Sequence, residues 1–417
     1  MSEPKNNPDP KKPAVPAKNT SIMLGAALLM ATSAIGPGFL TQTSKFTATY
    51  LASFAFVIVL VIIMDVIAQT NIWSVIAASG LRGPEIANKV LPGLGVVLVI
   101  LVVIGGLAFN TGNVGGVALG LESIFGLNQK IGSLLGGLLA VCIFLSRGGK
   151  KVVDKVAQIA GLVIIAVMLY VCIRSKPPVG DAFIHIFTPE KPLDMVPVIL
   201  TLLGGSCGGY ITFSGAHRLL DAGYGGRQED VSYFRRSVRT GIAVSGTVRI
   251  LLFLAVLGVC SMAAGNAAAI IAASNPASEA FTLAIGNAGR ILFGIGLFSA
   301  GITSVIGAAY TSVSFLGSIN RFVKANERWF IVGFIAFSTL IMVLVPVGAA
   351  KMVILAGAVN GLILPISLCC VLLGARKKQV VGDYKHPMYL TVLGWIVAAI
   401  AAYIAVTALP NLANLFK

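Results

Sequence analysis

The chain has 417 residues, of which 57% are hydrophobic and 11% are charged, whereas roughly 25% of the residues of a soluble domain are charged. With a mean hydropathy of +0.92, this composition excludes an ordinary water-soluble enzyme, and it excludes a disordered chain because so much apolar surface must be buried. We expect an all-α polytopic membrane protein. The net charge of +16 would indicate nucleic acid in a soluble protein, but here the basic residues lie in short loops. We therefore expect a lipid bilayer and no nucleic acid as the partner.

The spans follow one another with short connections. Residues 1–20 are rich in Pro, Lys and Asn and are expected to form a disordered cytoplasmic tail. Residues 21–409 are expected to form one membrane domain, and residues 410–417 a short extracytoplasmic tail. Eleven apolar spans are predicted within the domain, at 21–47, 49–69, 94–121, 131–146, 154–174, 195–220, 236–262, 288–319, 328–347, 350–374 and 387–409.

The distribution of Lys and Arg between the loops predicts how the chain is oriented in the membrane. With the N-terminus in the cytoplasm, 21 of the 31 basic residues fall in cytoplasmic segments and six fall outside. Because positive residues are retained on the cytoplasmic side, this distribution predicts a multi-pass protein of the cell (inner) membrane with a cytoplasmic N-terminus.

Two spans contain interruptions that an ordinary membrane helix avoids. The first span carries Gly-Pro-Gly at residues 36–38, and the sixth carries Gly-Gly-Ser-Cys-Gly-Gly at residues 204–209. Irregular backbone at mid-membrane is tolerated where it lines a cavity or is buried in protein. Two breaks five spans apart predict an inverted repeat of two five-helix halves, residues 21–174 and 195–374, with residues 387–409 as an accessory helix.

In these two interrupted spans and in the helices around them, the sequence resembles the natural resistance-associated macrophage protein (NRAMP) family. The fold of that family is the leucine-transporter type of the APC superfamily. The family marks its first broken helix with Asp-Pro-Gly-Asn, where this chain has Gly-Pro-Gly-Phe at residues 36–39. The family's sixth helix carries Met-Pro-His, where this chain has Gly-Gly-Tyr at residues 208–210. Asn110 and Asn113 stand where the family's third helix has two acids, and residues 354–365 resemble its tenth helix.

The family's metal-binding side chains are missing from these motifs, and their absence changes the expected substrate. The resemblance implies a divalent-metal site built from the Asp, Asn and Met of those motifs, and Gly36, Phe39 and Gly208 replace all three. Without a carboxylate or a sulfur ligand, a dication receives little compensation for its lost hydration. The free amides of two broken helices instead attract anions.

The resulting prediction is a secondary active symporter that moves a small organic solute by alternating access. The solute is a carboxylate, an amino acid or a lactam such as 5-oxoproline. Each candidate also has a structural interpretation, in which Asn, Gln and Thr bond to neighbouring helices. The expected substrate-binding residues are Gly36, Pro37, Gly38, Phe39, Gln42, Thr43, Asn110, Asn113, Gly208, Gly209, Tyr210 and Asn360.

Coupling to Na⁺ or H⁺ stays open. Thr303 and Ser304 on the eighth span suit a sodium site, although hydroxyls also bond back to their own helix. Asp65 and His217 are ionisable residues inside spans and so are candidates for carrying a proton. Asp65 is expected near the inner end of its span, with Lys89 as a structural partner, and Arg249 has Asp65 or Asp221 as candidate partners.

Two alternatives remain at this stage. The first is a divalent cation transporter for Mn²⁺ or Mg²⁺, as the family resemblance implies, and the second is a membrane sensor that transports nothing. No enzyme and no cofactor are expected, since the sequence has no Walker loop and no Ser/His/Asp arrangement. No metal-ligating residues are predicted either, because all six cysteines lie within apolar runs.

Overall fold

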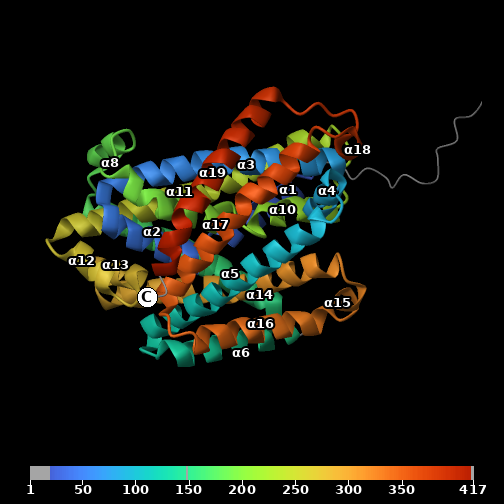
Figure 1. The fold of residues 1–417 in the computed structure, drawn as a ribbon. Coiled ribbons are helices and arrows are strands. Elements are labelled where there is room, and N and C mark those ends of the chain that lie inside the picture. Colours follow the sequence, from blue (N-terminus) through green and yellow to red (C-terminus); the bar gives the residue numbers. More distant parts are fainter. Residues whose placement is uncertain (1–18, 147–148, 415–417) are drawn as a thin grey trace, which may run out of the picture.

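The computed structural model describes residues 19–146 and 149–414, and this part of the chain is helical without strands. The helices run roughly side by side as a bundle (Figure 1). The first half contains α1 (Thr20–Ala34), α2 (Pro37–Tyr50), the 3-10 turn η1 (Leu51–Ser53), α3 (Phe54–Ser79), α4 (Gly83–Val90), α5 (Leu94–Phe125), α6 (Gln129–Leu145) and α7 (Gly149–Ser175).

The second half repeats the plan of the first. It contains α8 (Val179–His185), the turn η2 (Pro192–Met195), α9 (Val196–Cys207), α10 (Ile211–Asp221), α11 (Asp230–Met262), α12 (Asn266–Ala272), α13 (Pro276–Ile285), α14 (Asn287–Gly317), α15 (Arg321–Ala325), α16 (Glu327–Leu344) and α17 (Ala349–Gly374). The short α18 (Lys378–Val381) and the long α19 (Met388–Asn414) follow.

The predicted spans are confirmed as helices. In the described residues, nine segments are long and apolar enough to cross a membrane, and α1 and α6 are shorter apolar helices. The pairs α1/α2 and α9/α10 form the first and sixth spans, and each pair is one helix interrupted near its middle. The fold is therefore the leucine-transporter type with two broken helices.

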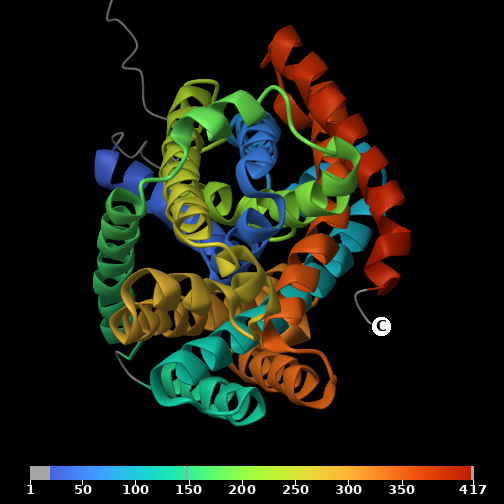
Figure 2. The same ribbon diagram turned by 90° about the vertical axis from the view of Figure 1, so that its left-hand side faces the viewer.

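Helix α5 packs against α14 and α17, and α6 lies beside it at the edge of the bundle (Figure 1 and Figure 2). Close approach of small residues allows α9 to lie directly against α17, because a Cβ at Gly204 would come within 1.9 Å of the carbonyl oxygen of Gly357. The buried core surrounds the two helix breaks, so the breaks lie inside protein and not against lipid.

Several predicted boundaries were wrong. The second span was expected to end at residue 69, but α3 continues to Ser79, so Asp65 lies near the middle of its helix and not near the inner end. The C-terminal tail was expected from residue 410, but α19 continues to Asn414. The N-terminal tail was expected to include Thr20, which begins α1 after the cap Asn19; residues 1–18 lie outside the described part.

The connections also contain helices that the sequence did not predict. Helices α8, α12 and α13 lie at one end of the bundle, and α4, α15 and α18 lie at the other (Figure 1). Helix α4 begins with Gly83 and Pro84, and the Glu85 carboxylate accepts from the backbone N–H of Arg82, which satisfies one of the free amides at the helix start. These short helices cover the ends of the long ones.

Candidate functional site

The first helix breaks between Ala34 and Pro37. Ile35 ends α1 with its N–H donating to Ala31, and Gly36 is extended, with φ −94° and ψ −175°. Pro37 suits the first position of α2 because that position has no N–H partner in a helix. No side chain caps the N-terminus of α2, so its first amides face the break without a side-chain acceptor.

The second break spans Gly208 to Tyr210, so α9 continues through Gly204–Cys207, where the sequence predicted irregular backbone. Gly209 has a φ of +57°, which favours glycine. The hydroxyl of Thr212 donates to the carbonyl oxygen of Cys207 and so satisfies the end of α9. Tyr210 is buried and packs edge-on against Phe109 at 5.8 Å between ring centroids.

Neutral polar side chains from three helices lie at these breaks, and each has a buried nitrogen or oxygen atom without a hydrogen-bond partner. Gln42 donates through Nε2 to the carbonyl oxygen of Val353 at 3.3 Å, while its Oε1 has no partner. Asn113 Nδ2 and Asn360 Oδ1 are also buried without a partner, as is Thr43 Oγ1 further along α2. Because unsatisfied buried polar atoms are costly, this cluster is typical of a site completed by a bound molecule.

The glycines of the two breaks differ in the room around them. A Cβ on Gly36 would lie 3.4 Å from Ser304 Oγ and 3.6 Å from Asn113 Oδ1, so a side chain has room there. A Cβ on Gly208 would come within 2.6 Å of the backbone oxygen of Asn360, and one on Gly209 within 1.9 Å of Asn360 Oδ1. Helix α17 therefore fills the space that a methionine side chain would need at residue 208.

Of the other predicted residues, Pro37 and Gly38 lie at the start of α2. A Cβ on Gly116 of α5 would meet the Pro37 ring, and Gly38 faces Val353 and Gln42. Among the coupling candidates, Ser304 lies next to Gly36, as the contact above shows. Thr303 bonds back to its own helix, at 3.1 Å to the carbonyl oxygens of Ser299 and Ala300.

Two predicted residues turn away from the breaks. Asn110 donates to Ser338 Oγ on α16 at 2.8 Å. His217 stacks between Phe213 and Phe315, and its Nε2 accepts from the backbone N–H of Gly83 at 3.3 Å. These contacts favour the structural interpretation of both side chains.

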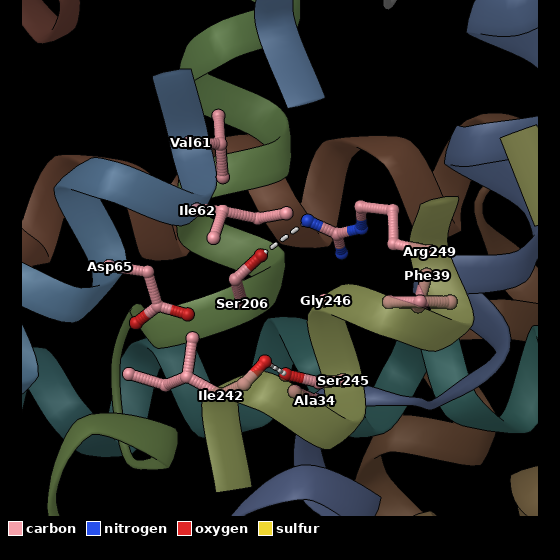
Figure 3. Close-up of a pocket in the computed structure, with 10 residues that line it drawn as sticks. All are labelled: Ala34, Phe39, Val61, Ile62, Asp65, Ser206, Ile242, Ser245, Gly246 and Arg249. Carbon is pink, nitrogen blue, oxygen red and sulfur yellow. Dashed lines mark hydrogen bonds between the residues drawn. The ribbon is translucent and has the colours of Figure 1, made fainter. Parts of the chain in front are cut away.

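Two charged side chains line a small cavity beside the breaks (Figure 3). Arg249 on α11 donates to Ser206 Oγ on α9 at 2.6 Å, and its guanidinium lies 4.3 Å from the centroid of the Phe39 ring. Asp65 on α3 accepts from Gln69 Nε2 at 2.6 Å. The remaining lining residues are Ala34, Val61, Ile62, Ile242, Ser245 and Gly246.

The structure contradicts two of the predicted charge pairings, that of Asp65 with Lys89 and that of Arg249 with Asp221. Lys89 is not the partner of Asp65, because its Nζ donates to the carbonyl oxygen of Gln379. Asp221 is not the partner of Arg249, because it pairs with Arg82 at 2.5 Å. Asp65 and Arg249 line the same cavity.

Sequence reasoning missed Arg249 and Ser206 as site residues. An arginine inside an apolar span was the available signal, because intramembrane charges usually serve a function. Nothing in the sequence placed its guanidinium between the two breaks. Within the described residues, no group of three or more His, Cys, Asp or Glu side chains could hold a metal ion.

A family model described as natural resistance-associated macrophage protein-like matches residues 27–410. The chain belongs to this family. The membrane protein YcsG of Bacillus subtilis is 50% identical over 400 residues, which cover 95% of the NRAMP chain and 97% of that protein. A membrane protein of Haemophilus influenzae is 48% identical over 383 residues, covering 92% of the chain and 94% of that protein.

More distant similarities are to proteins named as metal transporters. The divalent metal cation transporter MntH of Klebsiella pneumoniae is 21% identical over 290 residues, or 68% of each protein. The crystal structure of a mutant manganese transporter of Eremococcus coleocola has a TM-score of 0.73 at 16% identity, covering 95% of the NRAMP chain and 89% of that chain. These similarities establish a membrane transporter with the leucine-transporter-type fold.

Proposed function

We propose that this NRAMP-family chain is a secondary active transporter that moves a small organic solute by alternating access. The observation that carries the proposal is the set of buried, unpartnered, neutral hydrogen-bonding atoms at the two breaks: Gln42 Oε1, Asn113 Nδ2 and Asn360 Oδ1. They offer both donors and acceptors, which suits a polar organic molecule. The protein transports this molecule and does not transform it.

The same region is poorly suited to a dication. Gly36, Phe39 and Gly208 provide no side-chain ligand, and α17 occupies the space at Gly208. The guanidinium of Arg249 over Phe39 adds a positive charge, which repels a cation at short range in a low-dielectric interior. Transport of Mn²⁺ or Mg²⁺ nevertheless remains the alternative function, because the family includes divalent metal cation transporters.

The solute class that fits is a carboxylate, an amino acid or a lactam acid. The lactam 5-oxoproline combines an amide N–H and C=O, which match the amides of Gln42, Asn113 and Asn360, with a carboxylate that suits the N-termini of α2 and α10. Coupling uses Na⁺ or H⁺, and Ser304 beside Gly36 is the hydroxyl that a sodium site at the first break would use.

The expected sidedness places the N-terminus in the cytoplasm and the protein in the cell membrane. The end of the bundle with α4, α15 and α18 (Figure 1) carries the basic residues Arg82, Lys89, Arg321, Lys324, Lys377 and Lys378. By the distribution of positive charge, this end faces the cytoplasm.

Uptake into proteoliposomes tests the proposal. The full chain is reconstituted, and labelled 5-oxoproline, proline, lactate and manganese are offered in parallel, each with and without an excess of unlabelled compound. The proposal predicts saturable uptake of at least one organic solute and no uptake of manganese above that of empty vesicles. Saturable manganese uptake that chelation abolishes, with no organic uptake, overturns it in favour of the metal.

A further inference from the structure

Arg249 is a buried cation with unused hydrogen-bonding capacity. Its side chain is 3% exposed, and Nη1 donates to Ser206, whereas Nε and Nη2 have no partner. A guanidinium buried in this way is unfavourable unless an anion or an acceptor completes it. Two adjacent N–H donors of one guanidinium match the two oxygens of a carboxylate.

The position of Arg249 connects both halves of the binding region. The guanidinium lies over Phe39 in the first turn of α2, and its bonded partner Ser206 is two residues before the second break. The stacking on Phe39 orients the planar group, since arginine favours aromatic faces. An anion held by Nε and Nη2 therefore lies beside both breaks.

Asp65 supplies the opposite charge in the same cavity. The carboxylate is 3% exposed and bonded to Gln69. In the view of Figure 3, Ser206 lies between Asp65 and Arg249, and the structure gives no ion pair within 4.0 Å between the two. The titratable groups that face Asp65 in the described residues are Arg249 on α11 and Cys207 on α9.

We propose that Arg249 binds the carboxylate of the substrate through Nε and Nη2, and that Asp65 takes up the proton that accompanies it. This inference rests on the proposed function. It adds that the substrate is an anion and that the coupling ion is a proton. The empty cavity holds one positive and one negative group. A bound carboxylate adds a negative charge, and a proton from the same side of the membrane converts Asp65 to its neutral acid. The loaded cavity is then neutral again.

Charge balance gives the coupling ratio. One carboxylate and one proton cross together, the guanidinium keeps its proton throughout, and Asp65 returns its proton to water on the other side. A net charge buried in protein is costly, so loading with the anion alone is disfavoured. The cavity has room for about one water molecule, so the substrate enters only when the helices around the breaks move apart.

The unmodified protein gives the first test. Proteoliposomes containing a pH-sensitive dye receive labelled 5-oxoproline, with the membrane potential set by a potassium gradient and an ionophore. We expect uptake to be driven by an acidic exterior, to acidify the lumen by one proton per carboxylate, and to be unaffected by the membrane potential or by sodium. Uptake that requires sodium, or that moves net charge, overturns the coupling part of the inference.

Variants test whether Arg249 binds the carboxylate of the substrate. The binding of 5-oxoproline and of its uncharged carboxamide is measured with Arg249→Gln, Arg249→Lys, Asp65→Asn and, as a control, Arg239→Gln at an exposed arginine on the same helix. Removal of one partner of a buried charge pair lowers affinity by roughly 100-fold. We therefore expect that loss for the acid in Arg249→Gln, a smaller loss in Arg249→Lys, and little change for the carboxamide in either.

The remaining variant separates binding from coupling. Asp65→Asn imitates the neutral acid, so we expect it to bind 5-oxoproline and to exchange it across the membrane, but to lose acceleration by the pH gradient.

If Arg249→Gln binds 5-oxoproline as tightly as Arg239→Gln does, the proposed binding of the carboxylate by Arg249 is overturned. If Arg249→Gln does not fold, Arg249→Lys and the acid-to-carboxamide preference of the unmodified protein decide the question. Absence of all carboxylate uptake by the unmodified protein contradicts the proposed function itself, which is a different result.

Discussion

At the scale of single residues, the two breaks differ in whether a side chain fits there. Gly36 leaves space beside Asn113 and Ser304, whereas Gly208 is pressed against the backbone of Asn360. A carboxylate is therefore sterically possible at residue 36, and a thioether at residue 208 is not possible unless α17 moves. The packing of α9 on α17, as well as the sequence of the motifs, therefore limits which side chains residue 208 can carry.

Gly36→Asp tests the charge preference of the first break. The new carboxylate has room, and it lies where we propose that an anionic substrate binds, so repulsion at short range should reduce 5-oxoproline uptake by about 10-fold or more. Gly36→Asn has nearly the same shape without the charge and is expected to retain most of the uptake. Equal uptake by the two variants, measured in proteoliposomes at matched protein content, contradicts an anionic substrate at this position.

The residue pattern predicted the breaks but not every residue around them. Gly-Pro-Gly and the glycine-rich sixth span identify interruptions, because few ordinary membrane helices contain them. Asn110 and Asn113 were predicted together because they stand where the third helix of the NRAMP family has two acids three residues apart. Such residues differ by about 60° around a helix, and that rotation directs Asn110 to Ser338 and Asn113 to Gly36. Which neighbour each face meets depends on the tertiary fold.

At the scale of elements, a polar network holds α3, α11 and the connection between α18 and α19 together. Asn71 Oδ1 accepts from His386 Nε2 at 2.8 Å, and Arg235 bonds to Ser74 at 2.7 Å and to Tyr384 at 2.9 Å. These polar residues of α3 explain why its predicted end was wrong. They resemble the end of an apolar span in the sequence, but they bond to neighbouring helices and the helix continues.

The network predicts a dependence of stability on pH. Burial and the nearby Arg235 lower the pKa of His386 to about 4, against about 6.5 in an unfolded chain. The unfolded chain therefore binds more protons between these values, so stability is complete above about pH 6.5 and is lost as the pH falls toward 4. Thermal unfolding in detergent should show a Tm that falls from about pH 7 to about pH 5.

Two variants identify the source of this slope. His386→Gln should have a lower Tm at neutral pH and a weaker fall on acidification, because the titrating group is gone. His185→Gln, on α8 at the other end of the bundle, is the matched control and should keep the slope of the unmodified protein. An unchanged slope in His386→Gln would show that another group is responsible.

At the scale of the whole molecule, the ends of the bundle differ in character. One end carries α8, α12 and α13, and the other carries α4, α15 and α18 with their basic residues. The number and order of the membrane helices could be predicted because hydropathy and loop charge act over whole spans. The short surface helices could not, because their sequences are too brief to carry a periodic signal.

Reporter fusions test the orientation. An odd number of crossings with a cytoplasmic N-terminus places the C-terminus outside the cytoplasm. Green fluorescent protein fused after Lys417 should be dark and alkaline phosphatase at the same position should be active, while an N-terminal fluorescent fusion should be bright. A bright C-terminal fluorescent fusion would reverse the assigned sidedness.

The central claim is that the site between the two breaks holds an organic anion and no metal ion. Anomalous diffraction from crystals grown with manganese, compared with crystals grown with 5-oxoproline, tests it most directly. We expect no manganese peak at the breaks, and density for the solute with its carboxylate against Arg249. A manganese peak beside Gly36 and Gly208, together with micromolar affinity for manganese in calorimetry, would contradict the account.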